Sequence, residues 1–154
     1  MRFTLTSPLL HHPAPPELFG GSAVAEVARA AEAAGFDALA FTEHPMPSDR
    51  WLNAGGHDAL DPFIALTWAA AATERLRLLT NITVVAYRNP FLLAKTVATL
   101  DALSEGRVIL GAAAGYLKSC TAWDEAMRER AKSSKDDPRA AEDLSSFAKS
   151  VGRQ

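Results

Sequence analysis

The chain has 154 residues, about the size of one domain, and 16 basic against 18 acidic residues give it a net charge of -2. This balance excludes the basic footprint of a nucleic-acid-binding protein, and no segment approaches the roughly 20 apolar residues of a membrane-spanning helix. Because Cys120 is the only cysteine and the N-terminus lacks the apolar stretch of a signal peptide, we expect a cytoplasmic protein with no nucleic-acid or membrane partner.

The N-terminal residues predict a strand and then a helix. Residues 2–7 alternate polar and apolar side chains and run into a proline-rich stretch, which indicates a strand followed by a loop. From Ser22, the predicted N-cap, apolar residues recur at helical spacing up to Gly35, a residue type suited to the left-handed conformation that ends a helix.

The same order repeats in the next part of the chain. A short apolar strand is expected over 37–42, where Pro45 then prevents further ladder pairing. A loop over 46–60 follows, and Asp61 with a proline after it predicts the N-cap and first turn of a helix over 62–73.

Two more strands are expected in the chain after this helix. An apolar, β-branched run over 76–86 precedes Asn89, which starts another helix, and Gly106 separates that helix from a strand over 107–111. The predicted strands start 31 to 38 residues apart, close to the roughly 30 residues per unit of a (β/α)₈ barrel. The sequence therefore predicts an α/β fold, the N-terminal half of a TIM barrel, with four parallel strands and their helices.

A doubly wound parallel sheet is the competing architecture. Gly111 and Gly115, which follow a predicted strand, resemble the start of a dinucleotide-binding fingerprint. The second and third glycines of that motif do not fit, so the barrel is the preferred interpretation.

Several ordered motifs carry a resemblance to a known family. They are Ala33-Ala34-Gly35-Phe36-Asp37, Thr42-Glu43-His44, Asp61-Pro62-Phe63, Tyr87-Arg88-Asn89-Pro90-Phe91-Leu92-Leu93-Ala94-Lys95, Leu100-Asp101-Ala102-Leu103-Ser104-Glu105-Gly106-Arg107 and the segment 111–116. Together they resemble the luciferase-like monooxygenase superfamily, and most of all its branch of oxidoreductases that use the deazaflavin coenzyme F-420. The resemblance implies a TIM barrel that binds coenzyme F-420 or FMN at the carboxyl ends of its strands. It also implies hydride transfer with a small-molecule substrate, or monooxygenation by a reduced flavin and oxygen.

The resemblance ends near residue 118. We expect residues 1–118 to form a partial luciferase-like TIM-barrel domain and residues 119–154 to form a divergent polar tail, partly helical or disordered. One short helix is predicted there, starting at Pro138. Members of the family continue with four more strands, so we interpret the chain as truncated or frame-shifted.

His44 is the predicted catalytic residue. It follows the second predicted strand, at the face where barrels of this type place their active sites, and an imidazole can transfer protons near neutral pH. The resemblance implies that His44 contacts the flavin or the substrate, and a loop histidine that caps a backbone group is the alternative. The adjacent Glu43 points away from it by strand alternation, so we expect Glu43 to be structural and salt-bridged.

Six residues at the ends of the third and fourth strands are the predicted cofactor-binding residues. They are Thr80, Asn81, Ile82, Gly111, Ala113 and Gly115. The first three correspond to the family's bulged segment beneath the flavin ring, which in many relatives includes a non-prolyl cis peptide, and a plain buried strand is the alternative. The last three would let the backbone approach a planar ring or a phosphate closely, although a simple tight turn would also explain them.

Five loop residues are expected on the same face, where they would line a substrate pocket. They are His11, His12, Trp51, Asn53 and His57, and each alone is more simply explained as an ordinary loop residue. The histidines have no cysteine or carboxylate at ligand spacing, so no metal site is predicted.

Two functions of different classes remain open. The chain is either a flavin- or deazaflavin-dependent oxidoreductase of the luciferase-like family, or a non-catalytic half-barrel remnant or assembly module. A half-barrel leaves its first and last strands with unpaired backbone groups, and two copies could associate into one closed barrel. A homodimer is therefore expected under the second hypothesis.

Overall fold

A computed structural model describes residues 1–115 of the chain. All of them belong to one structural unit, Met1–Leu117. The predicted domain boundary at residue 118 and the helix expected from Pro138 lie outside the described residues.

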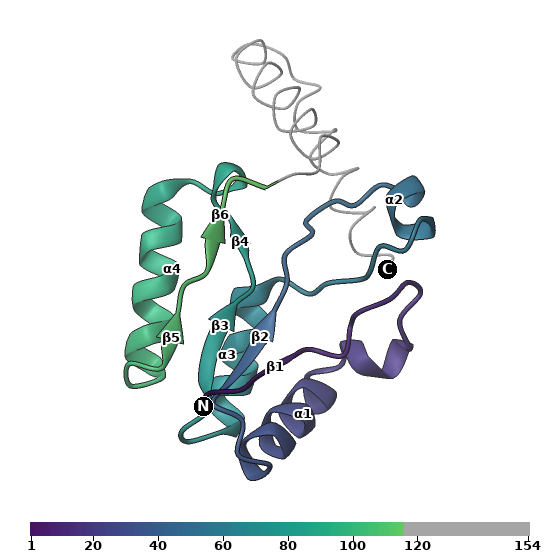
Figure 1. Cartoon of the computed structure of the whole chain (residues 1–154). Helices are drawn as coiled ribbons and strands as arrows, with labels where there is room; N and C mark the ends of the chain where they lie inside the picture. Colours follow the sequence, from purple (N-terminus) through teal and green to yellow (C-terminus); the bar gives the residue numbers. More distant parts are fainter. Residues whose placement is uncertain (116–154) are drawn as a thin grey trace. The chain divides into compact units, whose positions relative to one another are not determined.

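Four parallel strands form the main sheet (Figure 1). Their order across the sheet is β1 (Thr4–Thr6), β2 (Ala38–Phe41), β3 (Arg77–Thr80) and β5 (Val108–Ile109). Each of these strands pairs in parallel with the one that precedes or follows it in the chain. A doubly wound sheet reverses its strand order at a switch point, whereas consecutive order is that of a barrel segment. The predicted α/β fold with four parallel strands is confirmed, and the doubly wound alternative is wrong.

Helices connect the strands of this sheet. They are α1 (Gly21–Ala33), α3 (Pro62–Ala72) and α4 (Pro90–Leu103), with a short helix α2 (Asp49–Asn53) in the loop after β2 and 3-10 turns at Pro16–Phe19 and Val85–Tyr87. The helix of the fourth predicted unit would lie beyond residue 115, outside the described part of the chain. Within that described part, no helix is long and apolar enough to cross a membrane.

The first residues of the helices show which of the predicted N-caps are correct. Asp61 and Asn89 cap α3 and α4 as predicted, because each side chain accepts hydrogen bonds from the backbone amides two and three residues further on. The prediction for α1 was wrong by two residues. Its N-cap is Gly20 rather than Ser22, and no side chain caps the helix there.

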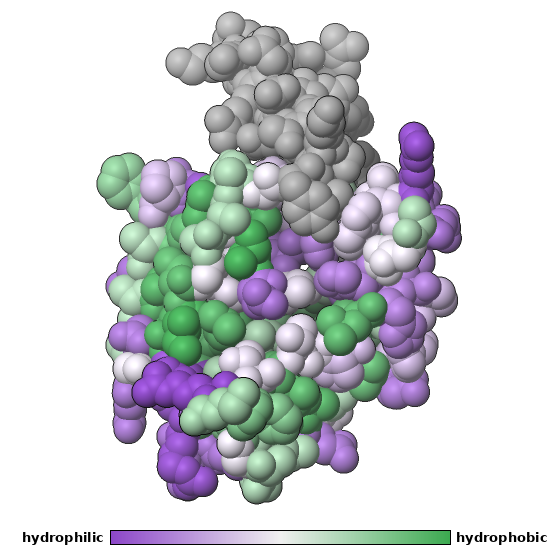
Figure 2. Space-filling view, viewed as in Figure 1, coloured by the Kyte–Doolittle hydropathy of each residue, from purple (hydrophilic) through white to green (hydrophobic). Residues whose placement is uncertain are grey.

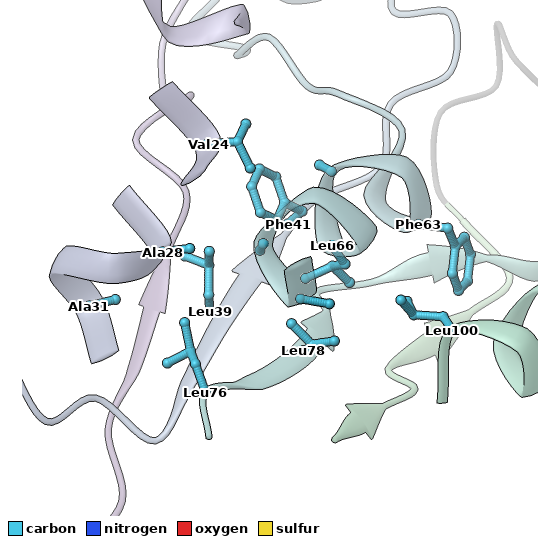
Figure 3. Packing of buried hydrophobic residues seen from close by; sticks show 13 residues of the cluster. Val24, Ala28, Ala31, Leu39, Phe41, Phe63, Leu66, Leu76, Leu78 and Leu100 are labelled. Atoms are coloured by element: carbon cyan, nitrogen blue, oxygen red, sulfur yellow. The ribbon is translucent and has the colours of Figure 1, made fainter. Parts of the chain in front are cut away.

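One apolar row crosses the sheet and faces the helices. The parallel register aligns Leu39 with Leu5 on one side and with Leu78 on the other, and Leu78 with Val108. Leu39 and Leu78 are fully buried in the same cluster as Leu66 of α3 (Figure 3). Because strand side chains alternate between faces, this row fixes which face of the sheet the helices cover.

The third strand does not run straight through 76–86 as predicted. It ends at Thr80, the peptide bond between Asn81 and Ile82 is cis, and a separate short strand β4 (Thr83–Val84) follows. β4 pairs in parallel with β6 (Ala112–Ala113), which lies just after β5 in the chain. The interruption falls where the resemblance implied a non-prolyl cis peptide, and the alternative of a plain uninterrupted strand is wrong.

Candidate active site

The carboxyl ends of β2, β3 and β5 meet at one edge of the sheet. Across the first pair, the Asn81 amide donates to the carbonyl of Phe41 over 2.7 Å. Across the second pair, the Thr83 amide donates to the carbonyl of Gly111 over 2.8 Å. The segments that follow these three strands are therefore held side by side, which is the arrangement that builds active sites in barrels.

Thr80 and Gly111 hold two of these segments in direct contact. The Thr80 hydroxyl donates to the Gly111 carbonyl over 2.7 Å and accepts from the Gly111 amide over 3.0 Å. A Cβ at Gly111 would lie 2.2 Å from the backbone carbonyl oxygen of Thr80, so no side chain fits at this position. Thr80 is itself fully buried, so its hydroxyl binds the backbone of Gly111 and is not exposed on the surface of the site.

The other predicted cofactor-binding residues lie around this contact. Asn81 and Ala113 are exposed and Ile82 is half-buried. Gly115 has a φ of 86°, and a Cβ there would lie 2.6 Å from Val84 Cγ1. The structure thus brings all six predicted residues together on two neighbouring segments, and the exposed ones present small side chains or an amide.

His44 lies in a cluster of aromatic rings just after β2. Its ring centroid is 4.6 Å from that of Trp51 and 4.6 Å from that of His57, and its Nε2 is 3.2 Å from His57 Nε2. Trp51 comes from α2, whose start is capped by Ser48. A Cβ at Gly56 would lie 2.4 Å from the Trp51 ring, so the glycine leaves room for this packing. The cluster therefore joins the end of β2 to the loop over 46–60.

The environment of His44 favours its neutral form. Burial and, as the smaller cause, the positive charge on His57 together lower the pKa of His44 to about 4. The imidazole of His44 is consequently neutral at neutral pH and has one ring nitrogen free of a proton. A ring in this state can accept a proton from a reacting group.

Asp58 ties this cluster to the loop after β1. Its carboxylate accepts a hydrogen bond from the Ala14 amide over 2.9 Å and lies 3.0 Å from Nδ1 of His12. Burial alone would raise the pKa of Asp58, but the hydrogen bonds from Ala14 and His12 outweigh burial and lower it. The carboxylate is therefore an ionised anchor between two loops that lie at the same edge of the sheet.

Glu43 is structural, as expected. Its side chain is buried, accepts a hydrogen bond from the Val84 amide and pairs with the guanidinium of Arg88. Arg88 also bonds to Asp61 over 2.7 Å and lies 4.8 Å from the ring centre of Phe63. This pairing connects the residues after β2 to those after β4.

Sequence reasoning undervalued part of this site. The sequence places Trp51 and His57 among possible pocket residues and explains each more simply as an ordinary loop residue, whereas the structure packs both against His44. Asp58 and Arg88 were not singled out at all. The available signal was local: a tryptophan and a histidine in the loop that follows a catalytic candidate at a strand end.

Comparison with known proteins identifies the family. The family model described as luciferase-like monooxygenase matches residues 1–141. The chain belongs to the luciferase-like monooxygenase family. Among curated members of the luciferase-like group, it is 36% identical over 110 residues to F-420-dependent glucose-6-phosphate dehydrogenase of Tsukamurella paurometabola, an alignment covering 69% of this chain and 31% of that protein. The corresponding enzyme of Amycolatopsis mediterranei is 33% identical over 139 residues, covering 88% of this chain and 37% of that protein.

Solved structures of luciferase-like proteins share the fold. The oxygenating constituent of 3,6-diketocamphane monooxygenase from Pseudomonas putida, solved with FMN, superposes with a TM-score of 0.67 at 19% identity, covering 80% of this chain and 32% of that one. Coenzyme F-420-dependent tetrahydromethanopterin reductase from Methanopyrus kandleri superposes with a TM-score of 0.56 at 25% identity, covering 75% of this chain and 27% of that one. This luciferase-like chain thus spans about a third of the length of the relatives it matches.

Proposed function

We propose that this chain forms the N-terminal part of the active site of an oxidoreductase that uses coenzyme F-420 or FMN and a small-molecule substrate. The observation that carries the proposal is the position of His44, neutral and packed among aromatic rings, at the same sheet edge as the interrupted strand β3–β4. Relatives named as F-420-dependent dehydrogenases and a neighbour solved with FMN support the choice of cofactors.

The residues beside β4 fit a flat ring system. Ala113 and Gly115 are exposed and small, and no side chain fits at Gly111, so the strip formed by these three residues carries no bulky side chain. We assign the contact with the ring to these residues together with Asn81 and Ile82. A flavin or deazaflavin bound here supplies a site that accepts or donates a hydride.

His44 handles the proton that accompanies the hydride. When a substrate C–H bond breaks and its electron pair leaves as hydride, the neighbouring O–H must lose its proton if a carbonyl is to form. The unprotonated ring nitrogen of His44 can accept that proton, and in the reverse direction the protonated ring returns it. The rings of Trp51 and His57 exclude water from one side of His44.

Cofactor titration tests the proposal. The full 154-residue chain is titrated with coenzyme F-420 and with FMN while the fluorescence of the cofactor is followed. Saturable quenching is expected, with its loss in His44→Ala and in Ala113→Leu, where an added side chain blocks the strip. Ala102→Leu makes the same change at an exposed position of α4 and should bind as the wild type does. Failure of the wild type to bind either cofactor would favour the non-catalytic remnant.

We also propose that two copies of the chain associate through the open edges of the sheet. Within residues 1–115, β1 and β5 each pair with a single neighbour, so each has one edge of unpaired backbone groups. Exposed apolar residues gather over α4 and β5 (Figure 2), among them Leu103 at 70% and Leu110 at 44% exposure. Rotation about the barrel axis keeps all strands parallel, so a two-fold pair can bring each β1 beside the other copy's β5.

Light scattering tests this association. A dimer is expected at micromolar concentration, and Leu110→Lys should weaken it because the charge would be placed beside the open edge of β5. A folded, monodisperse monomer of the wild-type chain would overturn the proposal.

A further inference from the structure

The contact between His44 and His57 requires one proton between two ring nitrogens. Their Nε2 atoms are 3.2 Å apart, a distance at which one nitrogen donates and the other accepts. Two bare nitrogens would repel, and two N–H groups would clash. The identity of the donor therefore decides which tautomer His44 adopts.

The backbone decides which ring is the donor. Nδ1 of His57 lies 3.0 Å from the carbonyl oxygen of Asp58. A carbonyl only accepts, so Nδ1 of His57 carries a proton. The neutral His57 ring then has a bare Nε2, and the proton in the contact belongs to Nε2 of His44.

The carbonyl that starts this chain of bonds is itself held in place. The Asp58 carboxylate is bonded to the Ala14 amide and to the ring of His12, and the Asp58 amide donates to the carbonyl of His11 over 3.3 Å. Three bonds thus anchor Asp58 to the loop after β1.

We propose that His57 is a positioning residue that holds His44 in the tautomer with its proton on Nε2, so that Nδ1 is the nitrogen that exchanges protons with the substrate. This inference rests on the proposed role of His44. It extends that role by assigning the reactive nitrogen and by giving a function to a second histidine. Similar partners orient histidines in other sites through the second ring nitrogen, and here the partner is another imidazole.

The groups that surround His44 are compatible with this arrangement. His57 faces it from the loop over 54–61, and Trp51 faces it from α2 with no titrating group. On the β2 side, the carboxylate of Glu43 is committed to Arg88 and Val84. The Asp58 carboxylate is bonded to the Ala14 amide and the His12 ring in the loop after β1. Within residues 1–115, neither of these carboxylates therefore bonds to a ring nitrogen of His44 or His57.

Nitrogen NMR tests the tautomer directly. The full chain contains four histidines, so its ¹⁵N-histidine spectrum holds four ring systems that single His→Gln variants can assign. Long-range ¹H–¹⁵N correlations at pH 7 are expected to show His44 protonated on Nε2 and His57 protonated on Nδ1. In His57→Phe, which cannot accept a hydrogen bond, His44 should become a mixture of tautomers and its pKa should rise. In His57→Gln, an amide oxygen near the former Nε2 position can accept the bond, so the Nε2–H tautomer of His44 should return.

A control and a functional readout complete the test. His11→Gln removes an exposed imidazole from the same group of loops and keeps the backbone carbonyl that accepts from the Asp58 amide, so the His44 tautomer should stay unchanged. Where turnover with cofactor is measured, His57→Phe should lower kcat and move the acidic limb of the pH profile upward, and His57→Gln should restore both. A wild-type His44 protonated on Nδ1, or a His57→Phe spectrum with the tautomer unchanged, would overturn the inference. Because the spectra need no cofactor, they report on His57 even if the chain proves inactive.

Discussion

Arg88 and Glu43, 45 residues apart in the chain, form an ion pair in which the carboxylate is almost fully buried. The carboxylate has a third donor in the Val84 amide, and the guanidinium extends to Asp61 at the start of α3. Burial tends to lower the pKa of Arg88, but the bonds to Glu43 and Asp61 outweigh it and raise that pKa. The pair thus joins three segments next to the site, and the guanidinium of Arg88 stays charged.

Removal of one member of this pair should destabilise the fold strongly. Arg88→Met would leave the Glu43 carboxylate buried with a single backbone donor, and breaking a buried pair in this way costs about 3–5 kcal/mol. Urea unfolding followed by circular dichroism should show that loss. Arg29→Met, at an exposed position of α1, should change stability by no more than about 0.5 kcal/mol. The double variant Glu43→Gln/Arg88→Met should be less unstable than the sum of its two single variants, and strict additivity would contradict the pairing.

Sequence reasoning succeeded where the determining interaction is local. Asp61 and Asn89 cap helices through bonds to amides two and three residues away, so the residue type beside a proline was sufficient evidence. The prediction of Ser22 as the N-cap of α1 was wrong because Gly20 already has the extended backbone of an N-cap. No side chain caps α1, so no capping residue type indicates where the helix begins. The apolar spacing predicted the four strands of the main sheet because a buried sheet requires it, although the third strand ends at Thr80 and does not continue to residue 86.

Contacts distant in the chain could not be predicted in the same way. His44 and His57 are 13 residues apart across a loop whose path includes the short helix α2, which has too few residues to show a period. Arg88 lay inside a recognised motif, but its partner Glu43 comes from another strand. A residue type predicts what chemistry is available, whereas the tertiary path decides which groups meet.

Any side chain at Gly111 should disrupt the edge of the sheet that carries the site. In Gly111→Ala the new Cβ would lie 2.2 Å from a backbone oxygen of Thr80, and backbone cannot move aside as a flexible side chain can. We expect a loss of at least about 2 kcal/mol in urea unfolding and loss of cofactor binding. Gly20→Ala places its Cβ no nearer than 3.5 Å to another atom, so it should cost less than about 1 kcal/mol. Equal stability of the two variants would contradict the close contact.

His44 should make stability depend on pH in the mildly acidic range. In the folded chain the pKa of His44 is about 4, against an ordinary value of 6.5. The unfolded chain therefore binds the proton first as the pH falls. Between pH 6.5 and about 4 this difference lowers the free energy of unfolding, and below that range both states are protonated and the contribution stays constant. His44→Gln should remove this part of the slope when urea midpoints are compared at pH 7, 5.5 and about 4.5. If His44→Gln keeps the pH dependence of the wild type, the pKa of His44 is not lowered in the folded chain.

Arg107 should stabilise the base of the sheet through its planar guanidinium. It donates to the carbonyls of Ser104, Leu76 and Ala70 over 2.7, 3.2 and 3.0 Å, so one side chain joins the ends of α3 and α4 to the residue before β3. Lysine keeps the charge but has a single nitrogen that cannot reach three carbonyls in different directions. Arg107→Lys should therefore cost about 2 kcal/mol in urea unfolding, whereas Arg29→Lys should be nearly neutral. Because Arg107 lies at the opposite end of β5 from Gly111, the folded fraction of Arg107→Lys should retain wild-type affinity for the cofactor, and a weakened affinity would show that this end of the sheet also shapes the site.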